Sequence, residues 1–406
     1  MLRIEMLPAA HGDCLWIEYG SGSAVHRILI DGGPAHTYPA LRERILHLPA
    51  SERRFDLLVI THVDGDHIEG VIRLLLDAEV LGCRFERIWF NGREQLNTVP
   101  DPAGRPLGAL QGEMLGMLIA DYEARTGTRV WNQGFDQALA AIDRSKATLP
   151  VVELPGACRL TLLSPDHDRL LFLKGRWKKE LDRARVQSGD VNALRARLAA
   201  SRSLRPMGDV LGGPADDARA ELRRRHEFPA DDDSDLETGL EDTLGRSSGE
   251  PGVDAPFASD TSAANGSSIA LLLEYPASQP EVRLLLAGDA WPEVLEASIA
   301  TLLANPEKRL ALDAFKLPHH GSVANLSAGL LDRLRCSNYL VSTSGALFRH
   351  PHRRALDLIL ERHAGPGRPT LHFNYLTRCT APWSDAADQT SRGYRAQHPK
   401  GHSLTF

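Results

Sequence analysis

Residues 60–70 read Ile-Thr-His-Val-Asp-Gly-Asp-His-Ile-Glu-Gly and follow a mostly apolar run, Phe55 to Ile60, that suits a strand buried on both faces. Four potential metal ligands lie within six residues of this stretch: His62, Asp64, Asp66 and His67. A turn between a strand and a helix can point such side chains into one cavity, and imidazoles with carboxylates suit zinc, manganese or iron. A capping aspartate at a helix N-terminus would explain one carboxylate but not both histidines. The stretch therefore predicts a metal site directly after a strand.

Three further segments place aspartate or histidine side chains at the ends of expected strands. In chain order they read Ile-Leu-Ile-Asp-Gly-Gly at 28–33, Leu-Leu-Leu-Ala-Gly-Asp at 284–289, and Lys-Leu-Pro-His-His-Gly-Ser at 316–322. Taken alone, Asp31 and Asp289 could each be a plain turn residue. A His-His pair beside Gly-Ser is uncommon in structural loops, so His319 and His320 strengthen the metal hypothesis.

In this order along the chain, the segments resemble the metallo-β-lactamase superfamily, whose signature is His-x-His-x-Asp-His. The departure within the signature is Asp64, which stands where the family has its second histidine. The resemblance implies that His62 and Asp64 hold one metal ion. It implies likewise that Asp66 and His67 hold a second ion, so the predicted cofactor is a pair of divalent ions, Zn²⁺ or Mn²⁺.

The same resemblance assigns roles to the other segments. It implies that Asp31 supports the metal ligands from behind them and that Asp289 bridges the two ions. Of the late pair, His319 is the predicted ligand, and His320 is either an alternative ligand or a proton donor. These roles come from the family pattern and not from the spacing of the residues.

Within the superfamily, the chain is most similar to the soluble domain of the DNA-uptake competence protein ComEC and its free-standing relatives. Three elements carry this similarity: His11-Gly12-Asp13 before an apolar strand, Asn265-Gly266-Ser267-Ser268 where other members place a ligating histidine, and His350-Pro351-His352. Asn265 and Ser268 either replace that histidine or cap a hairpin. The candidate catalytic residues are Asp66, His320 and His352, and the candidate substrate-binding residues are His350, Ser322 and Asn265.

Two β-rich halves with outer helices predict an α/β (α+β) fold built as a four-layer αββα sandwich, and the resemblance covers residues 1–95 and 263–376. The predicted parts, in chain order, are a first half of the sandwich at 1–100, a helical insertion at 101–150, core strands at 151–165, a charged helical insertion with an acidic flexible loop at 166–262, and a second half at 263–406. In that second half we expect a hairpin of Ser268 to Tyr275 with Val282 to Ala287, and helices at Pro292 to Leu303, Ala324 to Arg335 and Arg353 to Arg362.

The composition bounds the compartment and the partners. The chain of 406 residues has a formal net charge of −6, which argues against nucleic-acid binding by the whole surface but leaves a local basic groove open. Its five cysteines are far apart, which predicts buried free thiols in a reducing compartment. With no apolar run of about 18 residues and no signal-peptide pattern, we expect a cytoplasmic protein without a membrane partner. The acidic run at 231–233 is either a solvated loop or a docking surface for a protein partner.

The resemblance implies a metal-dependent hydrolase that uses a metal-activated water on a phosphate-containing substrate, namely DNA, RNA or a nucleotide. A second hypothesis is hydrolysis of a lactone, thioester or amide. A third, from another class, is a non-catalytic binding module with a degraded metal site, which Asp64 and the missing histidine near Asn265 favour.

Overall fold

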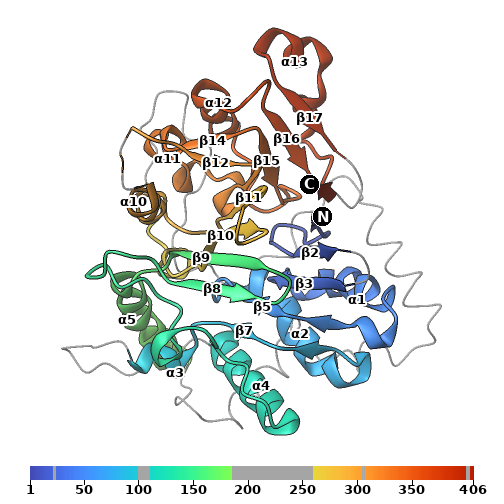
Figure 1. Ribbon diagram of the computed structural model, residues 1–406, viewed down its shortest axis with the longest axis vertical. Coiled ribbons are helices and arrows are strands. Elements are labelled where there is room, and N and C mark those ends of the chain that lie inside the picture. Colours follow the sequence, from blue (N-terminus) through green and yellow to red (C-terminus); the bar gives the residue numbers. More distant parts are fainter. Residues whose placement is uncertain (22–23, 99–109, 185–258, 304, 306, 399–402) are drawn as a thin grey trace.

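The computed structural model describes residues 1–21, 24–98, 110–184, 259–303, 305, 307–398 and 403–406. Within these residues the chain forms two large β-sheets with helices on both sides, so the predicted mixed α/β class is confirmed (Figure 1). The two ends of the chain lie side by side, because the last strand pairs with the first.

The first sheet contains six described strands, in the order β18-β1-β2-β3-β5-β7. Their bounds are Leu2–Met6 (β1), Leu15–Ser21 (β2), Ala24–Ile30 (β3), Leu57–Val59 (β5), Ile88–Trp89 (β7) and Ser403–Thr405 (β18). β1, β2 and β3 run antiparallel, whereas β3, β5 and β7 run parallel. The predicted strand from Phe55 to Ile60 is divided, because β4 (Arg54–Phe55) leaves this sheet and pairs with β6 (Arg84–Phe85).

The second sheet contains eight described strands, in the order β17-β16-β15-β13-β11-β10-β9-β8. Their bounds are Val151–Leu154 (β8), Cys158–Ser164 (β9), Ala270–Tyr275 (β10), Val282–Leu286 (β11), Ala314–Lys316 (β13), Asn338–Val341 (β15), Thr370–Phe373 (β16) and Arg395–Gln397 (β17). β10 and β11 are antiparallel, which confirms the predicted hairpin. From β11 to β17 the strands run parallel.

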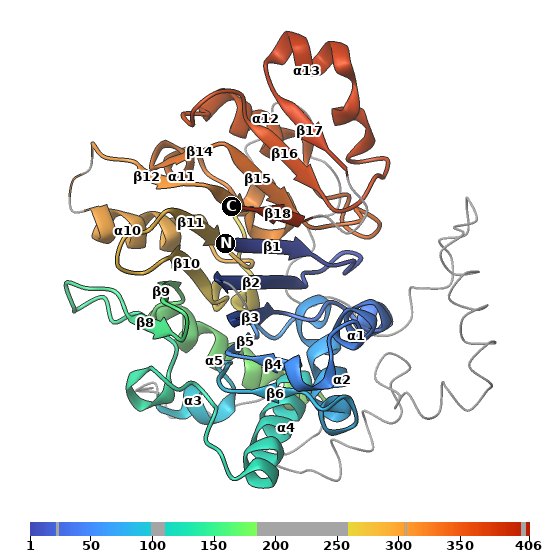
Figure 2. The same cartoon turned by 45° about the vertical axis from the view of Figure 1, so that its right-hand side comes forward.

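Alternation along the strands explains how the layers pack. Ile28 and Ile30 belong to the apolar cluster that both sheets share, whereas Leu29 between them belongs to the cluster with α1 (Tyr38–Leu46) and α2 (Gly65–Leu81). On the second sheet Leu273 faces the shared cluster, and Leu272 packs with α10 (Pro292–Leu303) and α12 (Arg353–Arg362). The helices therefore cover the two outer faces, α1 and α2 to the right and α10 to the left (Figures 1 and 2).

Two predicted helical regions differ from the structure. Within 101–150 the described helix is α4 (Leu110–Thr126), and the chain beyond it is mostly irregular because Gly127 and Asn132 have positive φ angles of 67° and 46°. The helix predicted at Ala324 to Arg335 is reduced to α11 (Ala328–Asp332). The Ser327 side chain caps α11 by accepting a hydrogen bond from the Leu330 amide, and Leu334–Cys336 (β14) then pairs with β12 (Leu310–Leu312).

The other described helices are α3 (Arg93–Thr98), α5 (His167–Ala184), α9 (Ala263–Gly266) and α13 (Ala386–Arg392). The predicted acidic loop at 231–233, and with it most of the charged insertion, lies outside the described residues. In the part of the chain that the structure describes, no helix has both the length and the apolar character to span a membrane. All five cysteines are free thiols, as predicted, and four of them are buried, whereas Cys379 is partly exposed.

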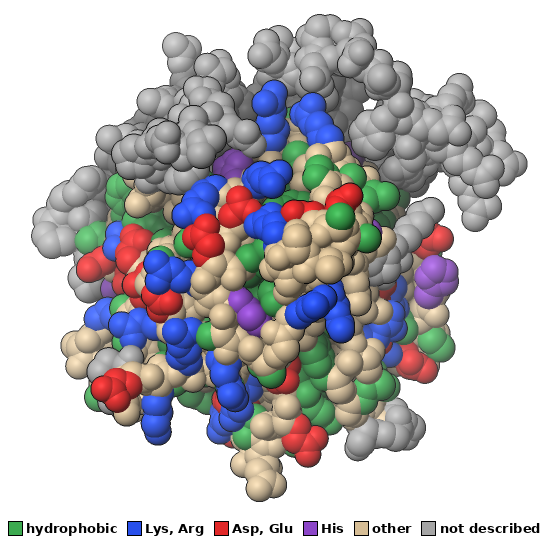
Figure 3. All heavy atoms as spheres, turned by 90° about the horizontal axis from the view of Figure 1, so that it is seen from above, with side chains coloured by type: hydrophobic (Ala, Val, Ile, Leu, Met, Phe, Trp, Pro, Cys, Tyr) green, Lys and Arg blue, Asp and Glu red, His purple; other side chains and the backbone are tan. Residues whose placement is uncertain are grey.

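The end of the molecule that carries α12 and α13 is rich in arginine and lysine, with acidic side chains between them (Figure 3). On α12, Arg354 pairs with Glu361, and Arg362 pairs with Asp332 at 3.0 Å. Exposed ion pairs of this kind contribute little stability, and their charges largely cancel.

Candidate metal centre

The candidate ligands meet at one end of the two sheets. Asp31 follows β3, His62 follows β5, Asp289 follows β11 and His319 follows β13. Since the neighbours β3 and β5 run parallel, as do β11 and β13, the carboxyl ends of these four strands share one edge of the sandwich. Such edges commonly carry the functional groups of α/β proteins.

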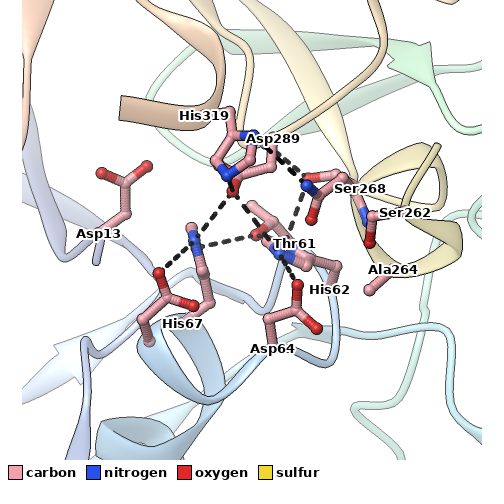
Figure 4. A network of polar contacts seen from close by, with 12 residues as sticks. Asp13, Thr61, His62, Asp64, His67, Ser262, Ala264, Ser268, Asp289 and His319 are labelled. Atoms are coloured by element: carbon pink, nitrogen blue, oxygen red, sulfur yellow. Dashed lines mark hydrogen bonds and ion pairs between the residues drawn. The ribbon is translucent and has the colours of Figure 1, made fainter. Parts of the chain in front are cut away.

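The Asp289 carboxylate lies among the imidazole rings of His62, His67 and His319 (Figure 4), and His320 is a fourth imidazole beside it. Its Oδ2 atom is 3.4 Å from the Nε2 atom of His67, 3.7 Å from that of His320, 3.8 Å from that of His62 and 3.9 Å from that of His319. Most of these distances are too long for hydrogen bonds. Two ligands that each bind one ion at about 2.0–2.2 Å lie about 3–4 Å apart, so the spacing suits shared metal ions.

Several atoms at this centre are buried without a hydrogen-bond partner in the described residues: Nε2 of His62, Nε2 of His67, Nε2 of His320 and Oδ1 of Asp289. Each such group costs about 1–3 kcal/mol when left unpaired. Four of them facing one point are poorly explained by packing alone. Imidazole and carboxylate donors suit zinc, manganese or iron, so the residues present fit a metal ion.

Asp31 holds the His67 ring from behind. The Nδ1–H of His67 donates to Asp31 Oδ2 at 2.8 Å, and the Thr61 amide and hydroxyl donate to the same carboxylate at 2.8 and 2.7 Å. His62 is fixed in a similar way, since its Nδ1 lies 3.0 Å from the Thr61 hydroxyl. With Nδ1 occupied in both rings, the Nε2 lone pairs face the centre.

Ser268 supports Asp289 from the hairpin. Its hydroxyl accepts a hydrogen bond from the Asp289 amide at 3.0 Å and lies 3.5 Å from Nδ1 of His62. Asn265 donates to Asp260 at 2.8 Å, and its buried Oδ1 has no partner in the described residues. Ser268 thus positions Asp289 and His62, whereas Asn265 positions the loop that carries Asp260.

The two remaining aspartates of the signature lie on opposite sides of the histidines. Asp64 begins α2, yet its side chain makes no capping hydrogen bond, and its Oδ2 is 3.5 Å from Nε2 of His62. Asp66 Oδ2 is 3.5 Å from Nε2 of His320 and 3.8 Å from that of His67. Helix capping does not account for the orientation of the Asp64 carboxylate, because that side chain, which is 38% exposed, accepts no hydrogen bond from the first turn of α2.

The late histidine pair adopts a strained backbone. His319 and His320 have φ angles of 46° and 55°, which non-glycine residues rarely adopt. The Nδ1 of His320 donates to the carbonyl oxygen of Ser342 at 3.0 Å, and its ring is fully buried. The Nδ1 of His319 bonds to Asn325 Oδ1 at 2.8 Å, and that ring is 25% exposed. The backbone thereby turns two successive rings toward one carboxylate, with His319 on the open side.

A buried ion pair lies behind His320. The Lys316 ammonium donates to Asp13 Oδ2 at 2.6 Å and to the carbonyl oxygen of Leu317 at 2.9 Å, and both charged side chains are almost wholly buried. Asp13 Oδ1 lies 3.4 Å from Nδ1 of His320. From the sequence, Asp13 was placed in the opening motif without a role, and Lys316 was quoted as the first residue of the late segment 316–322, also without a role.

The other predicted site residues are placed as follows. His350 is buried, and its ring centroid lies 5.2 Å from that of His319. The Nδ1 of His352 accepts a hydrogen bond from the Val323 amide at 3.2 Å. The Ser322 hydroxyl accepts one from a backbone amide two residues on, so His352 and Ser322 both order the late loop. Thr61, Asp260 and Asn325 were not predicted, because none of them stood at a ligand position of the recognised segments.

The charges of the centre depend on one another. Burial opposes a charge on His320, but Asp289 and Asp13 outweigh it and raise the pKa of the ring to about 9. The pKa of His67 is also raised despite burial, chiefly by Asp289. Burial alone would raise the pKa of Asp66 and Asp289, but the histidines, His67 first, lower both. The centre therefore attracts positive charge, and protons and cations compete for its ring nitrogens.

Comparison of the sequence with protein-family models and with curated proteins finds no match. The similarity to the metallo-β-lactamase superfamily accordingly stays a prediction. Imidazole and carboxylate side chains from both halves of the chain converge around Asp289, and this cluster is the feature that bears most directly on function.

Proposed function

We propose that the chain is a metal-dependent hydrolase of phosphodiesters with a metallo-β-lactamase-like sandwich and two divalent ions, Zn²⁺ or Mn²⁺. The observation that carries this proposal is the Asp289 carboxylate, with four imidazole Nε2 atoms within 3.9 Å of one oxygen. The order of layers, helices outside two facing sheets, is the arrangement expected of that fold.

The ligands divide into two overlapping sets. One set is His62, Asp64 and Asp289, and the other is Asp66, His320 and Asp289, with His67 close to both. In this assignment His320 takes the place that the sequence analysis gave to His319. The reason is geometric, because the Nε2 of His320 is buried and unpartnered beside Asp66, whereas His319 lies toward solvent.

When bound, the ions supply Lewis acidity toward the phosphate and toward water. Asp66 presents a carboxylate oxygen at the edge of the centre, where it can accept a proton from an attacking water. His319 keeps its Nδ1 on Asn325, and its partly exposed ring holds Nε2 3.9 Å from Asp289 Oδ2, where it can carry a proton to the leaving oxygen. The preference for a phosphodiester over a lactone, thioester or amide rests on the resemblance.

A binding module with a degraded site is the competing proposal, and Asp64 is its main support. Four buried ligand atoms that have no hydrogen-bond partner among the described residues argue against it, since a site without a function would lose such costly groups. Metal analysis of the purified protein separates the two. We expect about two ions per chain and hydrolysis of bis(p-nitrophenyl) phosphate in Mn²⁺ or Zn²⁺, with slower cleavage of an acetate ester. A chain that binds no ion from a Zn²⁺ or Mn²⁺ solution would exclude this function.

The two late histidines should respond differently to substitution. We expect His320→Ala to lose about one ion per chain, because its Nε2 lies beside Asp66 in one ligand set. His319→Ala should keep both ions and lower kcat roughly 10²-fold, the usual effect of losing a proton donor. Metal content and kcat of both variants check the assignment. Loss of an ion from His319→Ala alone would restore the original assignment.

A further inference from the structure

A strip of aromatic rings leads from the metal centre to the surface. Ring centroids lie 5.2 Å apart between His319 and His350, 5.9 Å between His350 and Phe348, and 6.1 Å between Phe348 and His11. The rings of Phe348 and His11 meet edge to face, with an angle of 72° between their planes. Phe348 is 45% exposed, so the strip begins at the buried histidines and ends at an aromatic ring in contact with solvent.

The loop that carries Phe348 is held at both of its ends. The Ser344 amide donates to the carbonyl oxygen of Ala10 at 2.6 Å, which ties the loop to the segment before His11. At the other end the His352 amide donates to the carbonyl oxygen of Gly321 at 3.1 Å, beside the late histidines. The exposed residues between these anchors are therefore presented at a fixed place next to the centre.

The tip of this loop exposes two apolar side chains and one cation. Leu347 is 55% exposed and precedes Phe348, and large apolar side chains so exposed are not needed for the core. Arg349 follows, is exposed, and makes no ion pair with any other described residue. Its φ angle of 56° is in the left-handed region, which a non-glycine residue occupies only when the surrounding structure imposes it. Arg354 on α12, by contrast, is already paired with Glu361.

We infer that this loop tip, Leu347 to Arg349, together with His11 is the subsite for single-stranded nucleic acid at the proposed hydrolase centre. A base of the strand stacks on the exposed face of Phe348, and a neighbouring phosphate pairs with Arg349. This inference rests on the proposed function, because the scissile phosphate must lie at the metal ions. Aromatic faces with nearby cations are the means by which proteins hold single strands regardless of sequence.

The chemistry of the tip favours a nucleic acid over another apolar ester. A purely hydrophobic leaving group would need no cation beside the aromatic ring. The centre itself is rich in carboxylates, which repel a second phosphate, so a cation outside the centre is needed to bind that phosphate. The chain as a whole carries a net charge of −6, so electrostatic attraction of a polyanion has to be local. An exposed arginine that has no ion pair among the described residues, beside an exposed ring, provides that local attraction.

The test compares two phosphorothioate strands of about 12 nucleotides, an oligothymidylate and an abasic strand, each labelled for fluorescence anisotropy with the full metal-loaded chain. We expect the oligothymidylate to bind about tenfold more tightly than the abasic strand. Phe348→Ala should remove that difference and leave abasic binding unchanged, whereas Phe348→Tyr should preserve it. Arg349→Gln should weaken both strands and flatten their salt dependence. Val80→Ala, an exposed apolar residue on α2, is the control and should change neither.

Hydrolysis of bis(p-nitrophenyl) phosphate, measured on the same preparations, distinguishes failure of the nucleic-acid subsite from failure of the proposed hydrolase function. Hydrolysis with equal affinity for both strands would overturn the subsite and leave the proposed function standing. A base-dependent difference that Phe348→Ala removes, in a protein that hydrolyses no phosphodiester, would support the subsite and overturn the function. A base-dependent difference that survives Phe348→Ala would place the stacking residue elsewhere and overturn the inference.

Discussion

Asp289→Asn is expected to abolish phosphodiester hydrolysis, lowering kcat/KM by about 10³-fold or more, and to remove most of the bound metal. The substitution keeps the shape of the side chain and removes its negative charge. It thereby takes away a carboxylate whose Oδ2 atom lies within 3.9 Å of the Nε2 atoms of all four imidazoles. Metal content per chain and the rate with a model phosphodiester measure the two effects.

The fold should survive Asp289→Asn, because Asp289 is anchored through its backbone. Its amide donates to Ser268, and its carbonyl oxygen accepts from Asn325 at 3.1 Å. Asp136→Asn is the matched control, since its carboxylate is 93% exposed, and it should retain metal and activity. An Asp289→Asn protein with full metal content and full activity would contradict the site assignment.

The part of the site that could be predicted from sequence is the part carried by local patterns. His62, Asp66 and His67 follow a buried strand directly, and the ends of parallel strands meet at one edge. Asp31 and Asp289 end strands in the same way. The resemblance to the metallo-β-lactamase superfamily implied that these segments meet. The parallel pairing of β3 with β5, and of β11 with β13, explains why their ends lie at one edge.

The parts that could not be predicted depend on backbone angles and on contacts between distant segments. Whether His319 or His320 faces Asp66 is decided by two successive positive φ angles, and the conformational preferences of histidine do not predict such angles. Asp13 and Lys316 meet across 303 residues of chain, and only the packing of the two sheets brings them together. Local sequence patterns contain neither the backbone angles nor the contacts between distant segments.

Secondary structure followed the same division. The helix Arg353–Arg362 has its predicted bounds, because Leu356 and Ile359 recur on one buried face. The helix predicted at Ala324 to Arg335 is wrong over most of its length, because Asn325 hydrogen-bonds to His319 and β14 pairs with β12. Tertiary contacts overrode local propensity where the chain contributes to the site.

Lys316→Met is expected to destabilise the metal-free protein by about 3–5 kcal/mol, because it leaves the Asp13 carboxylate buried without its counter-charge. Urea unfolding measures this loss. Lys146→Met is the matched control, since the Lys146–Asp136 pair is exposed, and it should cost less than about 1 kcal/mol. A Lys316→Met protein as stable as that control would show that Asp13 is not charged in the folded chain.

Adding Asp13→Leu to Lys316→Met separates stability from positioning. Replacing both charges by apolar groups of similar size should recover most of the lost free energy of unfolding, because no unpaired charge stays buried. Metal affinity should not recover to the same degree. Asp13 Oδ1 lies 3.4 Å from Nδ1 of His320, so its loss leaves the Ser342 carbonyl oxygen as the described polar contact of that nitrogen. A double variant that regains stability and metal affinity together would mean that the buried pair stabilises the two sheets without orienting His320.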